Sequence, residues 1–119
     1  MTAHSPGRPL PEEILDLVSA FARVLASSDG AALQKQSRLA TVVTSSPTMV
    51  DVLVPDRVER LDAPDGPLPV SALVHDEQGD EVGEILVWVK DGLLLGVEQA
   101  WFTDQPPQTW PPVERVKVH

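Results

Sequence analysis

The 119-residue sequence predicts an α+β fold, in which an N-terminal helix packs on an antiparallel sheet of about five strands with a C-terminal meander. Three observations indicate this class. Apolar residues near the N-terminus recur with helical spacing, β-branched runs dominate after Leu39, and an Asp-Gly pair separates two long apolar runs. The length fits a single domain over residues 1–119.

Residues 11–27 are expected to form the helix. Pro11 is tolerated in the first turn because its missing N–H would be unpaired there, and Glu12 and Glu13 suit the positive end of the helix dipole. The apolar stripe that would face the sheet comprises Ile14, Leu17, Val18, Phe21, Ala22, Val24 and Leu25.

The segments that flank this helix carry weaker patterns. Residues 1–9 are polar and contain proline and glycine, which predicts a flexible start. Residues 27–30 are expected to end the helix, with Gly30 as its left-handed terminator. Residues 31–38 are compatible with a short second helical segment.

Runs of β-branched residues predict the first two strands, over 40–44 and 49–54, with residues 45–48 as the turn between them. Residues 62–67 are expected to form a loop, because aspartate, proline and glycine dominate them. This loop is too short for a domain linker.

The clearest pattern follows this loop. Strands are predicted over 70–76, 82–90 and 93–102, joined by a turn at 77–80 and by a tight turn at 91–92. The Asp-Gly pair of the tight turn is a strong hairpin signal, because both central positions of a type I′ turn need a positive φ.

The two-residue loop fixes an expected register, in which Trp88 lies opposite Leu95 and Ile85 lies opposite Glu98. Both faces of this hairpin are largely apolar. One face is therefore expected under the helix, and the other is expected to be either half-exposed or buried in a partner. Trp88 and Trp101 share one face, where core packing is the default, whereas Glu98 falls on the other.

Residues 105–119 are expected to form a proline-rich C-terminal strap. Two proline pairs favour an extended path, since proline donates no ladder hydrogen bond. The strap is expected to pin Trp110 onto the sheet, and residues 113–119 are compatible with a last edge strand. The alternative is that the prolines form a ligand motif for another protein.

The charge of the chain is localised. Eighteen acidic and nine basic residues give a net charge of −9, and residues 51–104 alone carry −10 whereas the rest sums to +1. This balance argues against nucleic acid as a partner. A field of one sign over half of a small domain favours encounter with a basic protein. The alternative is that surface carboxylates simply keep the protein soluble.

Composition excludes several kinds of chemistry. Cysteine is absent, which excludes disulfides, thiolate metal sites and cysteine nucleophiles. No window approaches the roughly 18 apolar residues of a membrane helix. The first residues lack the apolar core of a secretory signal, so a cytoplasmic protein that does not bind membranes is expected.

No catalytic, cofactor or metal site is predicted. The serines lack a Gly-x-Ser-x-Gly elbow, and the seven glycines match neither a phosphate loop nor a dinucleotide fingerprint. The three histidines, His4, His75 and His119, are too scattered for a metal site. His75 is expected to be an exposed strand residue.

Six carboxylates are the candidates for partner binding. Most belong to the acidic turn at 76–81, whose spacing lacks the alternation and the terminal glutamate of a calcium loop. Glu98 is unusual because it lies within an apolar strand. It is expected to be a buried hydrogen-bonded group, a functional carboxylate or a residue of the solvent face. The candidates are Asp76, Glu77, Asp80, Glu81, Glu98 and Asp104.

Residues 82–112 (VGEILVWVKDGLLLGVEQAWFTDQPPQTWPP) resemble a group of small actinobacterial proteins of unassigned function. The shared features are a strand, an Asp-Gly turn, a strand with Leu-x-x-Glu, and an aromatic-rich segment with Asp-x-Pro-Pro. Proteins of this type resemble the immunity partners of polymorphic toxins, which are acidic, single-domain and cytosolic. The resemblance implies no catalytic residues, and it nominates Glu98, Trp101, Asp104 and Trp110.

These observations predict a non-enzymatic acidic binding protein, most concretely an immunity-type inhibitor that occludes a basic toxin domain. Its carboxylates would meet the lysines and arginines that hold the toxin's substrate. One alternative is a structural homodimer, formed through the exposed sheet face or the terminal strand at Val116 and Val118. Another is a small-ligand carrier with a pocket between the helix and the face of Trp88 and Trp101.

Overall fold

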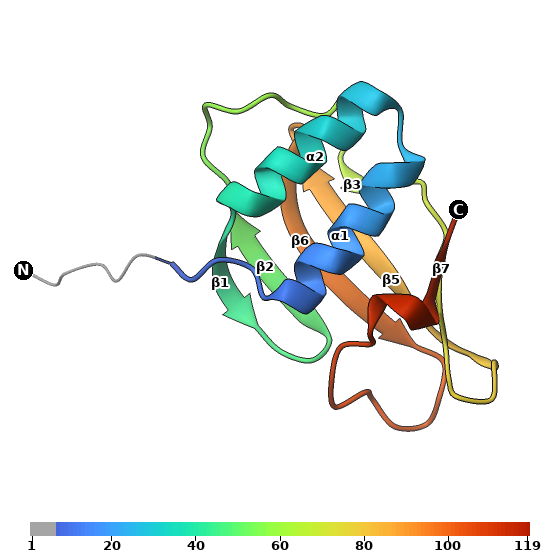
Figure 1. The fold of residues 1–119 in the computed structure, drawn as a ribbon. Coiled ribbons are helices and arrows are strands. Elements are labelled where there is room, and N and C mark those ends of the chain that lie inside the picture. Colours follow the sequence, from blue (N-terminus) through green and yellow to red (C-terminus); the bar gives the residue numbers. More distant parts are fainter. Residues whose placement is uncertain (1–6) are drawn as a thin grey trace, which may run out of the picture.

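The computed structural model describes residues 7–119. Within this range, two helices and a seven-stranded antiparallel sheet form an α+β fold, which confirms the predicted class (Figure 1). The elements are α1 (Glu12–Val24), α2 (Ser27–Leu39), β1 (Thr41–Ser45), β2 (Met49–Leu53), β3 (Gly66–Pro67), β4 (Ala72–His75), β5 (Glu81–Lys90), β6 (Leu93–Trp101), a 3₁₀ turn (Val113–Arg115) and β7 (Val116–Val118).

The strands lie in the order β1-β2-β6-β5-β4-β7, and the short β3 pairs with β5 beside β4. The predicted C-terminal meander is therefore present as β4-β5-β6, and β7 is the predicted last strand at the edge. The tight turn between β5 and β6 has positive φ at both Asp91 (53°) and Gly92 (74°), as a type I′ turn requires.

Both helices cover the same face of the sheet, as Figure 1 shows. The predicted stripe is buried there from Ile14 to Ala22, and Ile14, Leu17, Val18 and Phe21 are fully inaccessible to solvent. Its last two residues differ from the prediction, because Val24 is 45% exposed and Leu25 follows the end of the helix. They pack on the inward residues of the strands, such as Val87 at the centre of β5. The helical periodicity of residues 14–22 thus indicated the core face correctly.

The predicted role of Gly30 is wrong. The first helix ends at Val24, and Gly30 lies inside α2 rather than at a helix end. A Cβ atom on Gly30 would lie 2.4 Å from the carbonyl oxygen of Ala22, so glycine is required by the close approach of the two helices. A glycine between two helical patterns has the same sequence signature as a terminator.

The predicted register of the β5–β6 hairpin is wrong beyond its first two pairs. Val89 pairs with Leu94 as expected, but Leu95 is an extra residue and Trp88 pairs with Gly96. This β-bulge shifts every later pair by one residue, so that Glu98 lies on the same face as Trp88. In a run of apolar residues, no change in pattern marks the bulge.

At both ends of the chain, described residues bond to the hairpin of β1 and β2, as expected of the strap but not of a flexible start over residues 1–9. Residues 1–6 lie outside the described part of the chain, whereas Arg8 and Pro9 pair with β1, and the Arg8 carbonyl accepts the Val42 N–H at 2.8 Å. In the strap, Trp110 is half-buried and its indole Nε1 donates to the carbonyl of Ser46 at 3.0 Å. This hydrogen bond attaches the strap to the β1–β2 turn.

Candidate functional site

The acidic turn between β4 and β5 is held by one of its own carboxylates. Oδ1 of Asp76 accepts hydrogen bonds from the backbone N–H groups of Gln78 and Asp80, each at 2.9 Å. The Asp76 N–H in turn donates to the Asp80 carbonyl at 2.9 Å. Asp76 therefore fixes the loop that presents its neighbours, as short polar side chains do in turns.

Two other acids of this turn lie near basic groups. Glu77 Oε1 is 3.2 Å from a guanidinium nitrogen of Arg115, and Glu81 Oε2 is 3.9 Å from Nε2 of His75. The His75 side chain is only 13% exposed, so the expectation of an exposed histidine is wrong. The carboxylates of Glu77 and Glu81 remain largely in solvent, where such pairs add little stability.

The six candidate carboxylates do not form one cluster. Asp104 is exposed and follows the end of β6, where the Phe102 N–H donates to the Val82 carbonyl at the start of β5. It therefore lies at the same end of the sheet as the 76–81 turn. Glu98 lies in the interior of β6, opposite Leu86 of β5 and Met49 of β2. The structure thus separates Glu98 from the acidic end.

The sheet face that points away from the helices, called here the open face, carries both apolar and acidic side chains. Among the described residues no helix covers it (Figure 1). Along β2, β4 and β5, inward residues alternate with these outward ones, which are mostly half-buried. The open face comprises Met49, Asp51, Leu53, Leu73, Glu84, Leu86, Trp88, Leu95 and Glu98.

Strand register arranges the centre of the open face. Met49, Glu98 and Leu86 form one row across β2, β6 and β5, and Asp51, Gly96 and Trp88 form the next. A Cβ atom on Gly96 would lie 3.1 Å from Cε of Met49, so the methionine side chain extends over the glycine. The apolar surface is thereby continuous between the two rows.

Trp88 and Glu98 are bonded to each other on this face. The indole Nε1 of Trp88 donates to Oε1 of Glu98 at 2.9 Å, and both side chains are half-buried. Of the three expectations for Glu98, the structure supports a hydrogen-bonded group that is partly exposed. The assignment of Trp88 to the core is wrong, because the bulge at Leu95 gives both side chains the outer face.

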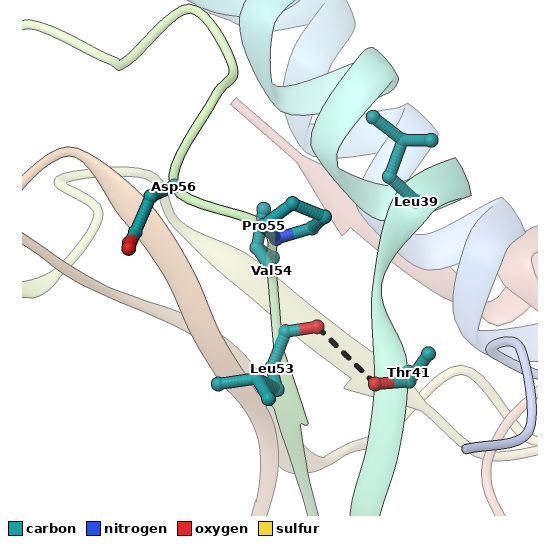
Figure 2. Close-up of a pocket in the computed structure, with 6 residues that line it drawn as sticks. All are labelled: Leu39, Thr41, Leu53, Val54, Pro55 and Asp56. Atoms are coloured by element: carbon teal, nitrogen blue, oxygen red, sulfur yellow. Dashed lines mark hydrogen bonds between the residues drawn. The ribbon is translucent and has the colours of Figure 1, made fainter. Parts of the chain in front are cut away.

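The structure does not support the predicted ligand pocket between the helix and the face of Trp88 and Trp101. Trp88 points away from them, and Trp101 is 43% exposed. A hollow of about 280 Å³ lies elsewhere, between the C-terminal end of α2 and the end of β2, and its lining is mainly apolar (Figure 2). Its hydroxyl, from Thr41, approaches the Leu53 carbonyl at 3.5 Å, and the Asp56 side chain is 90% exposed.

Residues 7–119 hold neither a metal-binding cluster nor a membrane-spanning helix. No group of three His, Asp or Glu residues in this range is arranged to hold a metal ion. No helix in the same part of the chain is long and apolar enough to cross a membrane.

Sequence reasoning missed several residues of the open face, namely Asp51, Glu84 and Leu86. The signal that pointed to them was the apolar character of both hairpin faces, which predicted a second face either half-exposed or covered by a partner. Because the bulge was not predicted, Trp88 and Glu98 were expected on opposite faces of the hairpin, which concealed their contact.

Comparison with known proteins identified no relatives: no protein-family model, no curated protein and no solved structure matches this chain significantly.

Proposed function

We propose that the protein is a non-enzymatic acidic binding protein of the immunity type, which binds a basic protein domain and blocks that domain's access to its substrate. The observation that carries the proposal is the open face, where apolar side chains and carboxylates alternate on a rigid sheet. This composition fits a partner that presents lysine or arginine around an apolar patch. A cytoplasmic location is part of this proposal.

The acidic end of the sheet supports the same function. Four carboxylates of the 76–81 turn and Asp104 lie there, within a segment of net charge −10. Because Asp76 fixes the backbone of the turn, these charges are held at one end of the domain. A localised negative field of this kind accelerates encounter with a basic protein, and the acceleration falls as salt rises.

The test is co-expression with the products of the neighbouring reading frames. The tagged protein is purified, and each co-expressed product is scored for a stoichiometric complex and for loss of its toxicity. A complex with a basic product that loses its activity supports the proposal. If every adjacent frame yields neither a complex nor protection, the proposal is wrong.

A homodimer is the second candidate, because β7 lies at the edge of the sheet and Val116 and Val118 belong to it. Edge strands offer unpaired backbone groups to a second copy. Light scattering at micromolar concentration separates the two candidates, since a monomer removes the support for self-association.

A further inference from the structure

The open face has the features of the centre of an interface rather than of a solvated sheet. Leu73, Leu86 and Trp88 lie on three successive rows of it, and Met49 of β2 extends over Gly96 of β6. Leu95 is 43% exposed and Leu53 is 67% exposed, at the end of the open face that lies next to the β5–β6 turn. Large apolar side chains of this kind, with a central tryptophan, are typical of the residues that dominate binding energy.

The surface has a depression at this end of the open face. A depression of about 270 Å³ is lined by Leu53, Leu93 and Leu95, together with Lys90 and Asp91. Its size suits one large apolar side chain from a partner, because interface anchors typically fill such pockets. The hollow is close to the tryptophan along β5, since Trp88 is two residues before Lys90.

The charges of the open face indicate the chemistry of the partner that would bind there. Asp51 and Glu98 lie in the central rows, and Glu84 lies in the row that also contains Leu73 and Lys117. The two lysines lie at its margins, Lys117 on the edge strand β7 and Lys90 at the last residue of β5, so the interior of the face is acidic. A second copy of the chain would bring carboxylates against carboxylates, which costs free energy in a desolvated interface.

We infer that the open face is the docking surface of the proposed function, and that its occupant is a protein segment that presents leucine-like side chains between lysines or arginines. This inference rests on the proposed function and adds a division of roles. The open face makes the short-range contacts that slow dissociation, whereas the 76–81 turn at the end of the sheet accelerates encounter.

The test uses a defined probe, an amphipathic helical peptide of about 15 leucine and lysine residues. The peptide is added to the isotope-labelled protein, and the backbone amides and the indole N–H signals of Trp88, Trp101 and Trp110 are followed by NMR. Saturable shifts of the Trp88 indole and of the Leu73 and Leu86 amides are expected. A peptide in which glutamate replaces lysine is expected to leave these signals unchanged.

Matched variants separate the open face from the acidic turn. Leu86→Ala is expected to raise the dissociation constant about tenfold, as truncation of a central contact does. Replacement of the turn acids by Asp76→Asn, Glu77→Gln, Asp80→Asn and Glu81→Gln together is expected to raise it less than about threefold at physiological salt. Glu84→Lys on the open face is compared with Glu12→Lys on α1, and only the first is expected to weaken binding.

Three results of the peptide titration would overturn this inference, and self-association is a fourth. They are saturable shifts confined to the turn and Asp104, the reverse order of the two variants, and the absence of saturable binding. Self-association of the free protein through the same signals would assign the face to a second copy and would also reject the basic occupant. Each outcome is independent of the co-expression experiment, so failure of the docking surface and failure of the proposed function are distinguishable.

Discussion

The indole Nε1 of Trp88 on β5 donates a hydrogen bond to Oε1 of Glu98 on β6, with 2.9 Å between the two atoms. The two residues are not directly opposite, since Trp88 pairs with Gly96 and Glu98 with Leu86. The bond therefore crosses the hairpin diagonally. It exists because the extra residue Leu95 gives the two side chains the same face.

Glu98→Ala is expected to lower the free energy of unfolding by about 1 kcal/mol, because the half-buried indole loses a charged acceptor. Glu98→Gln keeps a side-chain carbonyl and is expected to cost less than about 0.5 kcal/mol. Urea unfolding measures both values. Glu84→Ala is the control, since it removes a carboxylate from the same face and leaves the indole's acceptor in place. Equal losses for Glu98→Ala and Glu84→Ala would contradict the structural role of the bond.

Local patterns with a single physical cause were predictable from the sequence. The helical stripe of α1 is fixed by the need to bury one face, and the β5–β6 turn by the positive φ of Asp91 and Gly92. The acidic residues 76–81 were placed in a turn for similar reasons. Each of these features depends only on residues that are close together in the chain.

Features that depend on contacts between elements were not predictable. Gly30 is needed because Ala22 of the other helix approaches it, and that contact leaves no trace in the spacing of α2. The bulge at Leu95 also leaves no trace in the sequence, since both Leu94 and Leu95 are apolar and either could face inwards. The prediction of the candidate site was affected most, because a shift of one residue put Trp88 and Glu98 on opposite faces of the predicted hairpin, whereas they share the open face.

Gly30→Ala tests the close approach of the two helices. Alanine is the better helix former by about 1 kcal/mol, so a simple propensity argument predicts stabilisation. The added Cβ would lie 2.4 Å from the Ala22 carbonyl oxygen, and the helices must move apart. We expect a net loss of about 1–3 kcal/mol in urea unfolding. Ser28→Ala, at an exposed position of α2, is the control and is expected to change stability by less than about 0.5 kcal/mol. A gain in stability for Gly30→Ala would refute the packing argument.

Gln36→Leu tests a buried amide that ties α2 to the sheet. Its Nε2 donates to the carbonyls of Glu59 and Gly92, and its Oε1 accepts the Leu94 N–H at 2.7 Å. Leucine fills a similar volume but leaves these backbone groups without the amide, so a loss of about 2–4 kcal/mol is expected.

The measurements are urea unfolding and hydrogen exchange of the Leu94 amide, which should become faster relative to that of other β6 amides. Gln34→Ala on the same helix is the control, because the Gln34 side chain accepts a part-buried bond from Ser19 and its loss should cost less than about 1 kcal/mol. Unchanged protection of Leu94 would show that water or a neighbour replaces the amide.

Asp76 stabilises the acidic turn and also carries one of the four charges that the turn variant removes. Its Oδ1 accepts two backbone N–H groups, so Asp76→Ala is expected to cost about 1 kcal/mol and to speed hydrogen exchange at Gln78 and Asp80. Asp76→Asn keeps a side-chain oxygen and is expected to cost less than about 0.5 kcal/mol while it removes the charge. Asp80→Ala, an exposed change in the same turn, provides the baseline. If Asp76→Asn destabilises the turn as much as Asp76→Ala, the carboxylate charge itself holds the loop. In that case neutralising the turn would alter its shape as well as its field, and the encounter role would have to be measured through salt dependence alone.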